Sequence, residues 1–153
     1  IRIKNDLNNI ENEIFLNQNS FTTIDSKNNI VKINNKGLIT KKPLPSESKY
    51  LFTADKNNFV YINENILIIN GKASELKFGN FTNPIIFNNK LKDNISLTDK
   101  DEKLIYLFDT DSDLVPNFPV FGSSKIDLFE NKNSIKYITS IGENNEILVY
   151  SLY

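Results

Sequence analysis

The residues best suited to chemistry lie in one short segment, F-D-T-D-S-D-L-V-P-N-F-P, which runs from Phe108 to Pro119. Asp109, Asp111 and Asp113 alternate there in the D-x-D-x-D pattern that begins a calcium loop. In such a loop the oxygens at the first, third and fifth positions are ligands of the ion. The first candidate in this sequence is therefore a cation site with oxygen ligands.

The rest of this segment does not complete a calcium loop. The loop needs Gly at its sixth position for the sharp turn and a bidentate carboxylate at its twelfth. Counted from Asp109, these positions hold Leu114 and Val120. We therefore predict that Asp109, Asp111 and Ser112 supply side-chain oxygens to a tight turn. A weak, half-solvated cation site is kept as the alternative, and no metal is assigned.

Carboxylate catalysis is the second chemistry that the residue types allow. The chain has 0 Cys and 0 His, which excludes Ser-His-Asp and Cys-His nucleophile systems and the usual zinc sites. Asp99, Asp101 and Glu102 lie in the run D-K-D-E-K, where a solvated turn is the default interpretation. Two carboxylates about 5 to 10 Å apart across a concave pocket would favour a glycosidase-like enzyme, whereas carboxylates confined to turn tips would favour a binding module.

Composition excludes several partners and cofactors. The 18 basic and 19 acidic residues give a net charge of -1, which offers no electrostatic footprint for nucleic acid. The 5 Gly residues form no phosphate-binding motif, so no nucleotide or other cofactor is expected. No apolar run is long enough to span a bilayer. We expect neither a nucleic-acid partner nor membrane insertion.

The elements that must position these residues are short strands. Asn pairs separate runs rich in Ile, Val, Phe and Tyr, and Asn favours turns because it tolerates positive φ. Asn70-Gly71 is the dipeptide typical of a type I′ hairpin turn, and Asn63-Glu64-Asn65 is expected to turn the preceding strand. The sequence therefore predicts antiparallel hairpins.

A turn-plus-strand unit recurs along the chain. It begins T-I-D-S-K-N-N at Thr23, T-A-D-K-N-N at Thr53, L-T-D-K-D-E-K at Leu97 and S-I-G-E-N-N at Ser140. The aligned positions Ile30, Phe59, Leu104 and Ile147 are 29, 45 and 43 residues apart. The two longer intervals are typical of one four-stranded propeller blade, and the shorter one indicates either a degenerate repeat or a shorter first unit.

The tail from Phe108 to Tyr150 resembles the β-propeller repeats of the PQQ-like and FG-GAP type, which end long envelope proteins of Bacteroidetes. The stretches L-V-P-N-F-P-V and I-L-V-Y carry this resemblance. FG-GAP repeats hold calcium in a loop that corresponds here to Glu130–Ser134. Because Lys132 lies in the middle of that stretch, we predict that this copy has lost any such site.

Aromatic and proline-rich segments have two interpretations each. The tyrosines could line a sugar-binding face, but packing between sheets is favoured; they are Tyr50, Tyr61, Tyr106, Tyr137, Tyr150 and Tyr153. Lys41–Pro45 is interpreted as a loop with solvated charge.

Together these features predict an all-β protein of antiparallel four-stranded blades, propeller-like or a partial propeller. Residues 1–153 are expected to form one domain of about three to four degenerate blades, excised from a longer protein because the chain begins at Ile1 and has 0 Met. The expected function is a non-catalytic binding or scaffolding module of the bacterial cell envelope, periplasmic or on the cell surface, with a protein or glycan partner. A carboxylate-dependent, glycosidase-like domain is the alternative. Exposed blade edges also suggest a homodimer.

Overall fold

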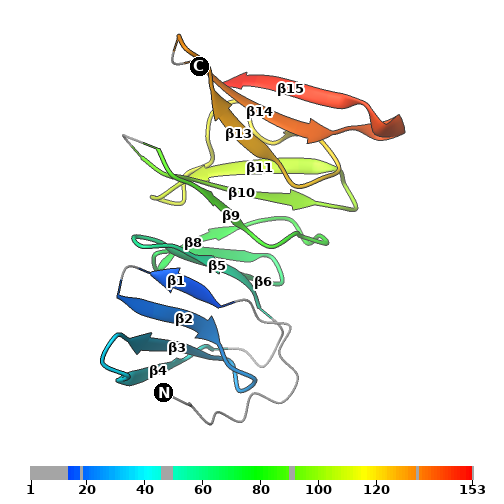
Figure 1. Cartoon of the computed structure of the whole chain (residues 1–153). Helices are drawn as coiled ribbons and strands as arrows, with labels where there is room; N and C mark the ends of the chain where they lie inside the picture. The colour runs from blue at the N-terminus through cyan, green and yellow to red at the C-terminus, as the bar shows by residue number, and fades with distance from the viewer. Residues whose placement is uncertain (1–13, 18, 46–49, 90–91, 134, 153) are drawn as a thin grey trace.

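The computed structural model describes residues 14–17, 19–45, 50–89, 92–133 and 135–152 (Figure 1). Within these ranges every regular element longer than one turn is a β-strand, and the strands form four antiparallel sheets. The strands of the first two sheets are β1 (Phe15–Asn17), β2 (Ser20–Ile24), β3 (Asn29–Asn34) and β4 (Ile39–Pro43), then β5 (Leu51–Ala54), β6 (Phe59–Asn63), β7 (Ile66–Ile69) and β8 (Lys72–Glu75). Those of the third and fourth are β9 (Ile85–Phe87), β10 (Asn94–Asp99), β11 (Leu104–Asp109) and β12 (Val120–Phe121), then β13 (Asp127–Glu130), β14 (Lys136–Ile141) and β15 (Ile147–Leu152).

Each sheet is a simple meander in which neighbours in sequence pair with each other. Tight turns with positive φ make this possible, and Asn supplies many of them. Asn70 and Gly71 have φ of 53° and 90°, as the type I′ prediction requires, and Glu64 turns β6 into β7 with φ of 53°. The predicted all-β fold of antiparallel sheets is confirmed; three of the sheets have the predicted four strands, and the fourth has three strands among the described residues.

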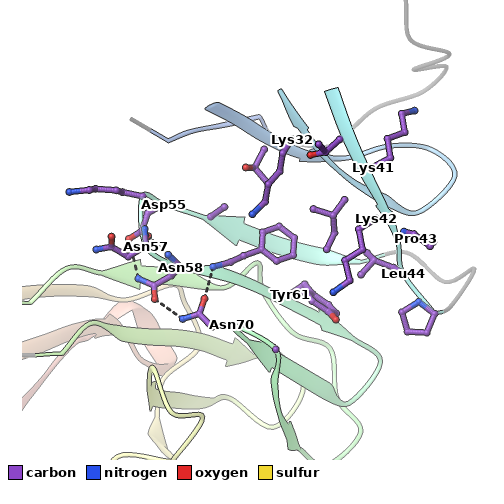
Figure 2. A pocket seen from close by; sticks show the side chains of 18 residues that line it. Lys32, Lys41, Lys42, Pro43, Leu44, Asp55, Asn57, Asn58, Tyr61 and Asn70 are labelled. Carbon is purple, nitrogen blue, oxygen red and sulfur yellow. Dashed lines mark hydrogen bonds between the residues drawn. The ribbon is translucent and has the colours of Figure 1, made fainter. Parts of the chain in front are cut away.

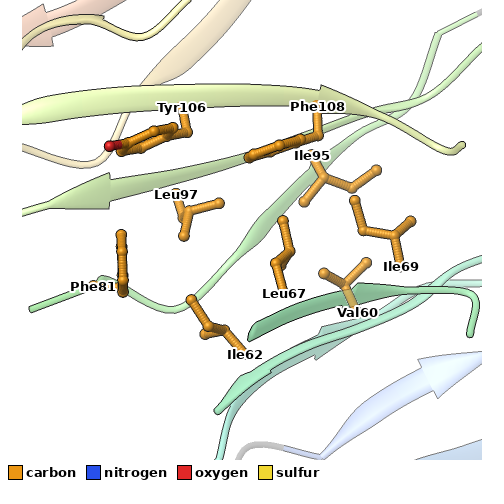
Figure 3. Packing of buried hydrophobic residues seen from close by; sticks show 9 residues of the cluster. All are labelled: Val60, Ile62, Leu67, Ile69, Phe81, Ile95, Leu97, Tyr106 and Phe108. Carbon is orange, nitrogen blue, oxygen red and sulfur yellow. The ribbon is translucent and has the colours of Figure 1, made fainter. Parts of the chain in front are cut away.

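The four sheets are stacked in sequence order, and an apolar layer lies between each consecutive pair (Figure 1). The largest layer lies between the second and third sheets, where Val60, Leu67 and Ile69 face Ile95 and Phe108 (Figure 3). The leading strands also lie near one another, because β5 contacts both β1 and β9. Stacked blades whose first strands adjoin are consistent with a partial propeller.

An aspartate turn closes one hairpin in each of the first three sheets. Asp25 closes β2–β3 and Asp99 closes β10–β11, so both turns join the second and third strands of their sheets. Asp55 closes β5–β6, which are the first and second strands of the second sheet. The unequal spacing of the sequence repeat therefore comes from a shift of one strand within the second sheet.

The interpretation of Lys41–Pro45 as a loop is wrong for its first three residues. Lys41, Lys42 and Pro43 belong to β4, which pairs with β3 along Ile39–Pro43. Because β4 is an edge strand, its outer side needs no partner, and a Pro at its end removes no ladder hydrogen bond from a second neighbour.

Candidate binding groove

A groove of about 840 Å³ lies between the first and second sheets (Figure 2). One wall comes from β3, β4 and the segment that follows them, and the other comes from β6 and from the turns at Asp55–Asn58 and Asn70-Gly71. The residues that line it are Thr22, Ile30, Lys32, Thr40, Lys41, Lys42, Pro43, Leu44, Pro45, Ala54, Asp55, Lys56, Asn57, Asn58, Phe59, Tyr61, Asn70 and Gly71.

The groove opens where lysine replaces apolar side chains on the inner face of the first sheet. Near the Asp25 turn, Ile24 pairs with Ile30, and Ile24 packs in the apolar layer shared with the second sheet. Two residues farther along β3, Lys32 pairs with Thr22 and Thr40. Side chains alternate between the two faces of a strand, which places Lys32 and Lys42 on this same face. Two positive charges therefore lie where the first and second sheets would otherwise pack against each other.

The third sheet shows what this position holds when the layer is closed. Its Asp99 hairpin pairs Thr98 with Ile105 and, two residues on, Ser96 with Leu107. Leu107 therefore corresponds to Lys32, and it is fully buried against the fourth sheet. The lysine is a departure from the packing pattern of the repeat, and such departures are expected at functional sites.

Half-buried aromatic rings form the apolar part of the groove. Phe59 and Tyr61 lie side by side on β6, with ring centroids 5.6 Å apart. Tyr61 also packs edge-on against the buried Tyr50. Burial raises the pKa of Tyr61, and the neighbouring Tyr50 raises it further, so its hydroxyl stays protonated at neutral pH. A ring surface with a neutral hydroxyl can contact a ligand without repelling its negative charge.

An amide network fixes the far end of the groove. The carboxylate of Asp55 accepts hydrogen bonds from the backbone N–H groups of Asn57 and Asn58, at 2.8 and 2.7 Å. The side chain of Asn70 joins this turn to the Asn70-Gly71 turn, because its Nδ2 donates to Asn58 Oδ1 and its Oδ1 accepts from Phe59 N (Figure 2). These contacts hold two turns together and leave the side chain of Asn57 exposed at the mouth of the groove.

Positive charge predominates in the groove. Among the described residues, Lys32, Lys42 and Lys56 line it together with a single carboxylate, that of Asp55. Lys41 also lines the groove, but its ammonium group is turned away from the other lining side chains (Figure 2) and binds Asp25, with a distance of 2.9 Å between Nζ and Oδ2. The groove is therefore basic although the net charge of the chain is -1.

The structure places Asp109 in a turn, as predicted. Its Oδ1 accepts hydrogen bonds from the N–H groups of Asp111 and Asp113, at 2.8 and 3.1 Å, and its Oδ2 binds Lys92 Nζ at 2.6 Å. Burial raises the pKa of Asp109, but the hydrogen bonds from Lys92 and from the two amides outweigh burial and hold it below its usual range. Ser112 sits at the turn with φ of 69°.

Asp111 and Ser112 have other roles than the predicted one. Their side chains reach neighbouring segments instead of their own turn. Asp111 forms ion pairs with Lys72 and Lys92, and hydrogen bonds from these two ammonium groups hold its pKa at about 2. Ser112 donates to the carbonyl oxygen of Lys72. Lysine ammonium groups thus occupy the carboxylate oxygens that a cation would need, and no cluster of metal-ligating side chains is found among the described residues.

The carboxylates considered for catalysis form a turn outside the groove. Asp99 is buried, and its Oδ1 accepts from the N–H groups of Asp101, Glu102 and Asn80, at 3.0, 3.3 and 3.3 Å. Asp101 and Glu102 are exposed at the tip of the same turn. Their hydrogen bonds are those of a structural turn, and none of these carboxylates lines the groove.

The stretch at Glu130 is likewise a turn. The described part shows Asn131 Oδ1 accepting from the N–H groups of Asn133 and Ile135, at 2.9 and 3.0 Å. Lys132 is exposed at its tip. Ser134 lies outside the described residues, so the prediction of a lost calcium loop stays a prediction.

The tyrosines have mixed environments. Tyr50 and Tyr106 are buried, which confirms packing for these two, and Tyr106 stacks on Phe108 with centroids 6.3 Å apart. Tyr150 donates from its hydroxyl to the carbonyl oxygen of Phe121. Tyr61 is the exception, because it is both packed and part of the groove. Tyr153 lies outside the described residues.

Comparison with known proteins supports the fold alone. No protein-family model matches the chain, and no curated protein matches it. Among solved structures it is similar to one described as "Crystal structure of the computationally designed Ika4 protein", with a TM-score of 0.60 and 12% sequence identity over 99% of this chain and 100% of that chain. In the part of the chain that the structure describes, no helix is long and apolar enough to cross a membrane.

Sequence reasoning missed the groove. Its two central lysines are ten residues apart and meet only through the pairing of β3 with β4. The net charge of the chain gave no sign of these lysines, because acidic residues in turns elsewhere balance the basic residues. The available signal was Lys32 at an inward position of an otherwise β-branched strand, I-V-K-I.

Proposed function

We propose that the protein is a non-catalytic binding module whose groove between the first two sheets holds an acidic saccharide. The observation that carries the proposal is the presence of Lys32 and Lys42 on a face where the repeat otherwise packs apolar side chains. At the equivalent position of the third sheet, a buried leucine helps to close the interface between the third and fourth sheets. The lysines give up this apolar burial between the first and second sheets and leave a basic groove there.

The chemistry of the lining favours a sugar. Aromatic rings such as Phe59 and Tyr61 offer flat apolar surface for sugar faces, and the amide of Asn57 can bond to hydroxyl groups. Lysine ammonium groups pair with the carboxylates of uronic-acid units. Addition of a peptide strand to β4 is disfavoured because Lys41, Lys42 and Pro43 are features that protect sheet edges.

The test is calorimetric titration of the protein with three probes: a polyuronate oligomer, a neutral oligosaccharide of the same length and poly-glutamate. The proposal predicts binding of the polyuronate that weakens at high salt, because the groove pairs are solvent-exposed. Tighter binding of the neutral sugar or of poly-glutamate, or no binding to any probe, would contradict it.

A pair of charge-matched variants locates the site. The double variant Lys32→Gln/Lys42→Gln is expected to weaken binding about 2- to 30-fold, since each exposed ion pair contributes about 0.2–1 kcal/mol. Lys100→Gln/Lys125→Gln changes the total charge equally at exposed lysines outside the groove. Equal losses in both variants would show that binding follows total charge and not the groove.

We also propose that the module acts in the bacterial cell envelope, in the periplasm or on the cell surface. The resemblance of Phe108–Tyr150 to repeats of envelope proteins supports this location. Fractionation of the source cells tests it: the protein should be recovered with the periplasmic or surface fraction, and recovery in the cytosol would contradict the proposal.

A further inference from the structure

The outer face of the fourth sheet is apolar and exposed. Strands β13–β15 pack one face on the third sheet through Leu128, Ile138 and Tyr150. Alternation places the next residues of each strand on the opposite face. That outer face carries Phe129, Tyr137, Thr139, Ile141, Ile147 and Val149, together with the polar residues Asp127 and Ser151.

The repeat shows that this kind of face is normally covered. The pairs Thr98–Ile105 and Ser96–Leu107 of the third sheet correspond to Ile141–Ile147 and Thr139–Val149 of the fourth, in the same register from the turn. Ile105 and Leu107 are 0% exposed because the fourth sheet covers them, whereas Ile147 and Val149 are 76% and 56% exposed.

The innermost strands repeat the correspondence. Phe87 on β9 pairs with Asn94, and Phe129 on β13 pairs with Tyr137 at the matching position. Phe87 packs in the layer between the third and fourth sheets, whereas Phe129 is exposed. All three strands of the fourth sheet thus carry, on their outer face, the residue types that pack between neighbouring sheets, but no further sheet of this chain covers that face among the described residues.

The opposite end of the stack offers the complementary face. Leu16 pairs with Phe21 on the side of the first sheet turned away from the second, and both are exposed. In the third sheet the corresponding pair, Ile86 and Ile95, packs on the second sheet. Val31 lies on the same face as Leu16 and Phe21 but is already buried, so the open part of this face is at the Leu16–Phe21 pair.

We propose that a second copy of this chain covers the fourth sheet with its first sheet. Two such contacts join two stacks of four sheets into a closed ring of eight, which is within the range of four to eight blades typical of propellers. Both ends are then covered by faces of the kind that the internal interfaces use.

Charge at the turns supports the first sheet of a second copy as the partner. Within the chain, Lys103 in the turn of the third sheet pairs with Glu143 in the turn of the fourth. Glu143 and Glu146 make the last turn acidic, and the corresponding turn of the first sheet carries Lys27. Stacking the first sheet on the fourth brings Lys27 of one copy toward Glu146 of the other.

Sedimentation equilibrium at increasing concentration tests the proposal on the unmodified chain. The expected species has twice the monomer mass of 17.6 kDa. Val149→Lys on one face and Phe21→Lys on the other are each expected to weaken association at least tenfold, because each removes a buried apolar side chain. Phe78→Lys is the matched control, since Phe78 is 77% exposed and lies on neither face.

Mixing distinguishes this arrangement from other dimers. Each face variant alone should associate at least tenfold more weakly than the unmodified chain, but an equimolar mixture of Val149→Lys and Phe21→Lys retains one unaltered contact and should recover part of the dimer. The charge swap Lys27→Glu with Glu146→Lys should restore association that either single change weakens. Circular dichroism of each variant confirms that it folds.

Two results would overturn the proposal. A monomer at concentrations up to about 100 µM would leave the face to a different partner, since stable dimers dissociate far below this concentration. Association that Val149→Lys abolishes and Phe21→Lys leaves unchanged would mean that two fourth sheets pair with each other.

Discussion

Replacement of Lys32 by leucine tests whether the groove is an opened version of the repeat's own core. Leucine is the residue found at the corresponding position, Leu107, where it is fully buried. Complete burial of a leucine side chain contributes about 1.5–3 kcal/mol to the free energy of unfolding. Lys32 is exposed on one wall of a groove that stays partly open, so burial of a leucine there would be incomplete. We therefore expect Lys32→Leu to stabilise the protein by about 1 kcal/mol, below the value for complete burial.

The assay is a thermal melt, in which this gain corresponds to a rise of about 2–4 °C for a domain of this size. Lys32→Thr is the control, because it removes the same charge and introduces a residue that suits a strand but adds little apolar area. The difference between the two variants isolates the burial of apolar surface. Lys32→Leu melting at or below Lys32→Thr would refute the view that the groove replaces a closed layer, while loss of saccharide binding in both variants is expected.

Three further predictions concern the turns. Asp111 has its pKa held at about 2 by Lys72 and Lys92, so its stabilising contribution is present above about pH 4 and is lost as the pH falls from 4 to 2; acid denaturation of Lys92→Met should show a smaller loss over that interval. Because the same ammonium groups occupy these carboxylates, the melting temperature should be equal in EDTA and in millimolar Ca²⁺, and a rise of several degrees with Ca²⁺ would demonstrate a cation site. Gly79→Ala should destabilise the protein by about 1–3 kcal/mol, measured by urea unfolding. The new Cβ would clash with Oδ2 of Asp99, whose carboxylate is held by three backbone amides. An unchanged urea midpoint would show that this turn rearranges without cost.

Features set by a few adjacent residues could be predicted from the sequence. The Asn70-Gly71 turn follows from the tolerance of Asn and Gly for positive φ, and the Asp109 turn follows from the tendency of aspartate to bond to amides two to four residues ahead. The strands follow from short β-branched runs between such turns. These features need no information from distant parts of the chain.

Features that depend on pairing between segments could not be predicted in the same way. The edge strand β4 holds two lysines and a proline, which are poor strand formers, and it is ordered by its pairing with β3 and by the ion pair of Lys41 with Asp25. Asp111 was expected to serve its own turn, but Lys72 from the second sheet and Lys92 from the β9–β10 connection reach it. The groove likewise exists only because sheet stacking brings Lys32 opposite Tyr61.

The groove and the exposed face of the fourth sheet are two opposite departures from one packing rule. At the first, lysine stands where the repeat places a buried leucine; at the second, the apolar residues of the rule are present but uncovered. Because the two lie at different sheets, they should respond to different substitutions. Lys32→Leu should leave the sedimenting mass unchanged, and Val149→Lys should leave the affinity per chain for the saccharide unchanged. A variant that alters both quantities would indicate that the groove is completed by the second copy, so that ligand binding and association depend on each other by thermodynamic linkage.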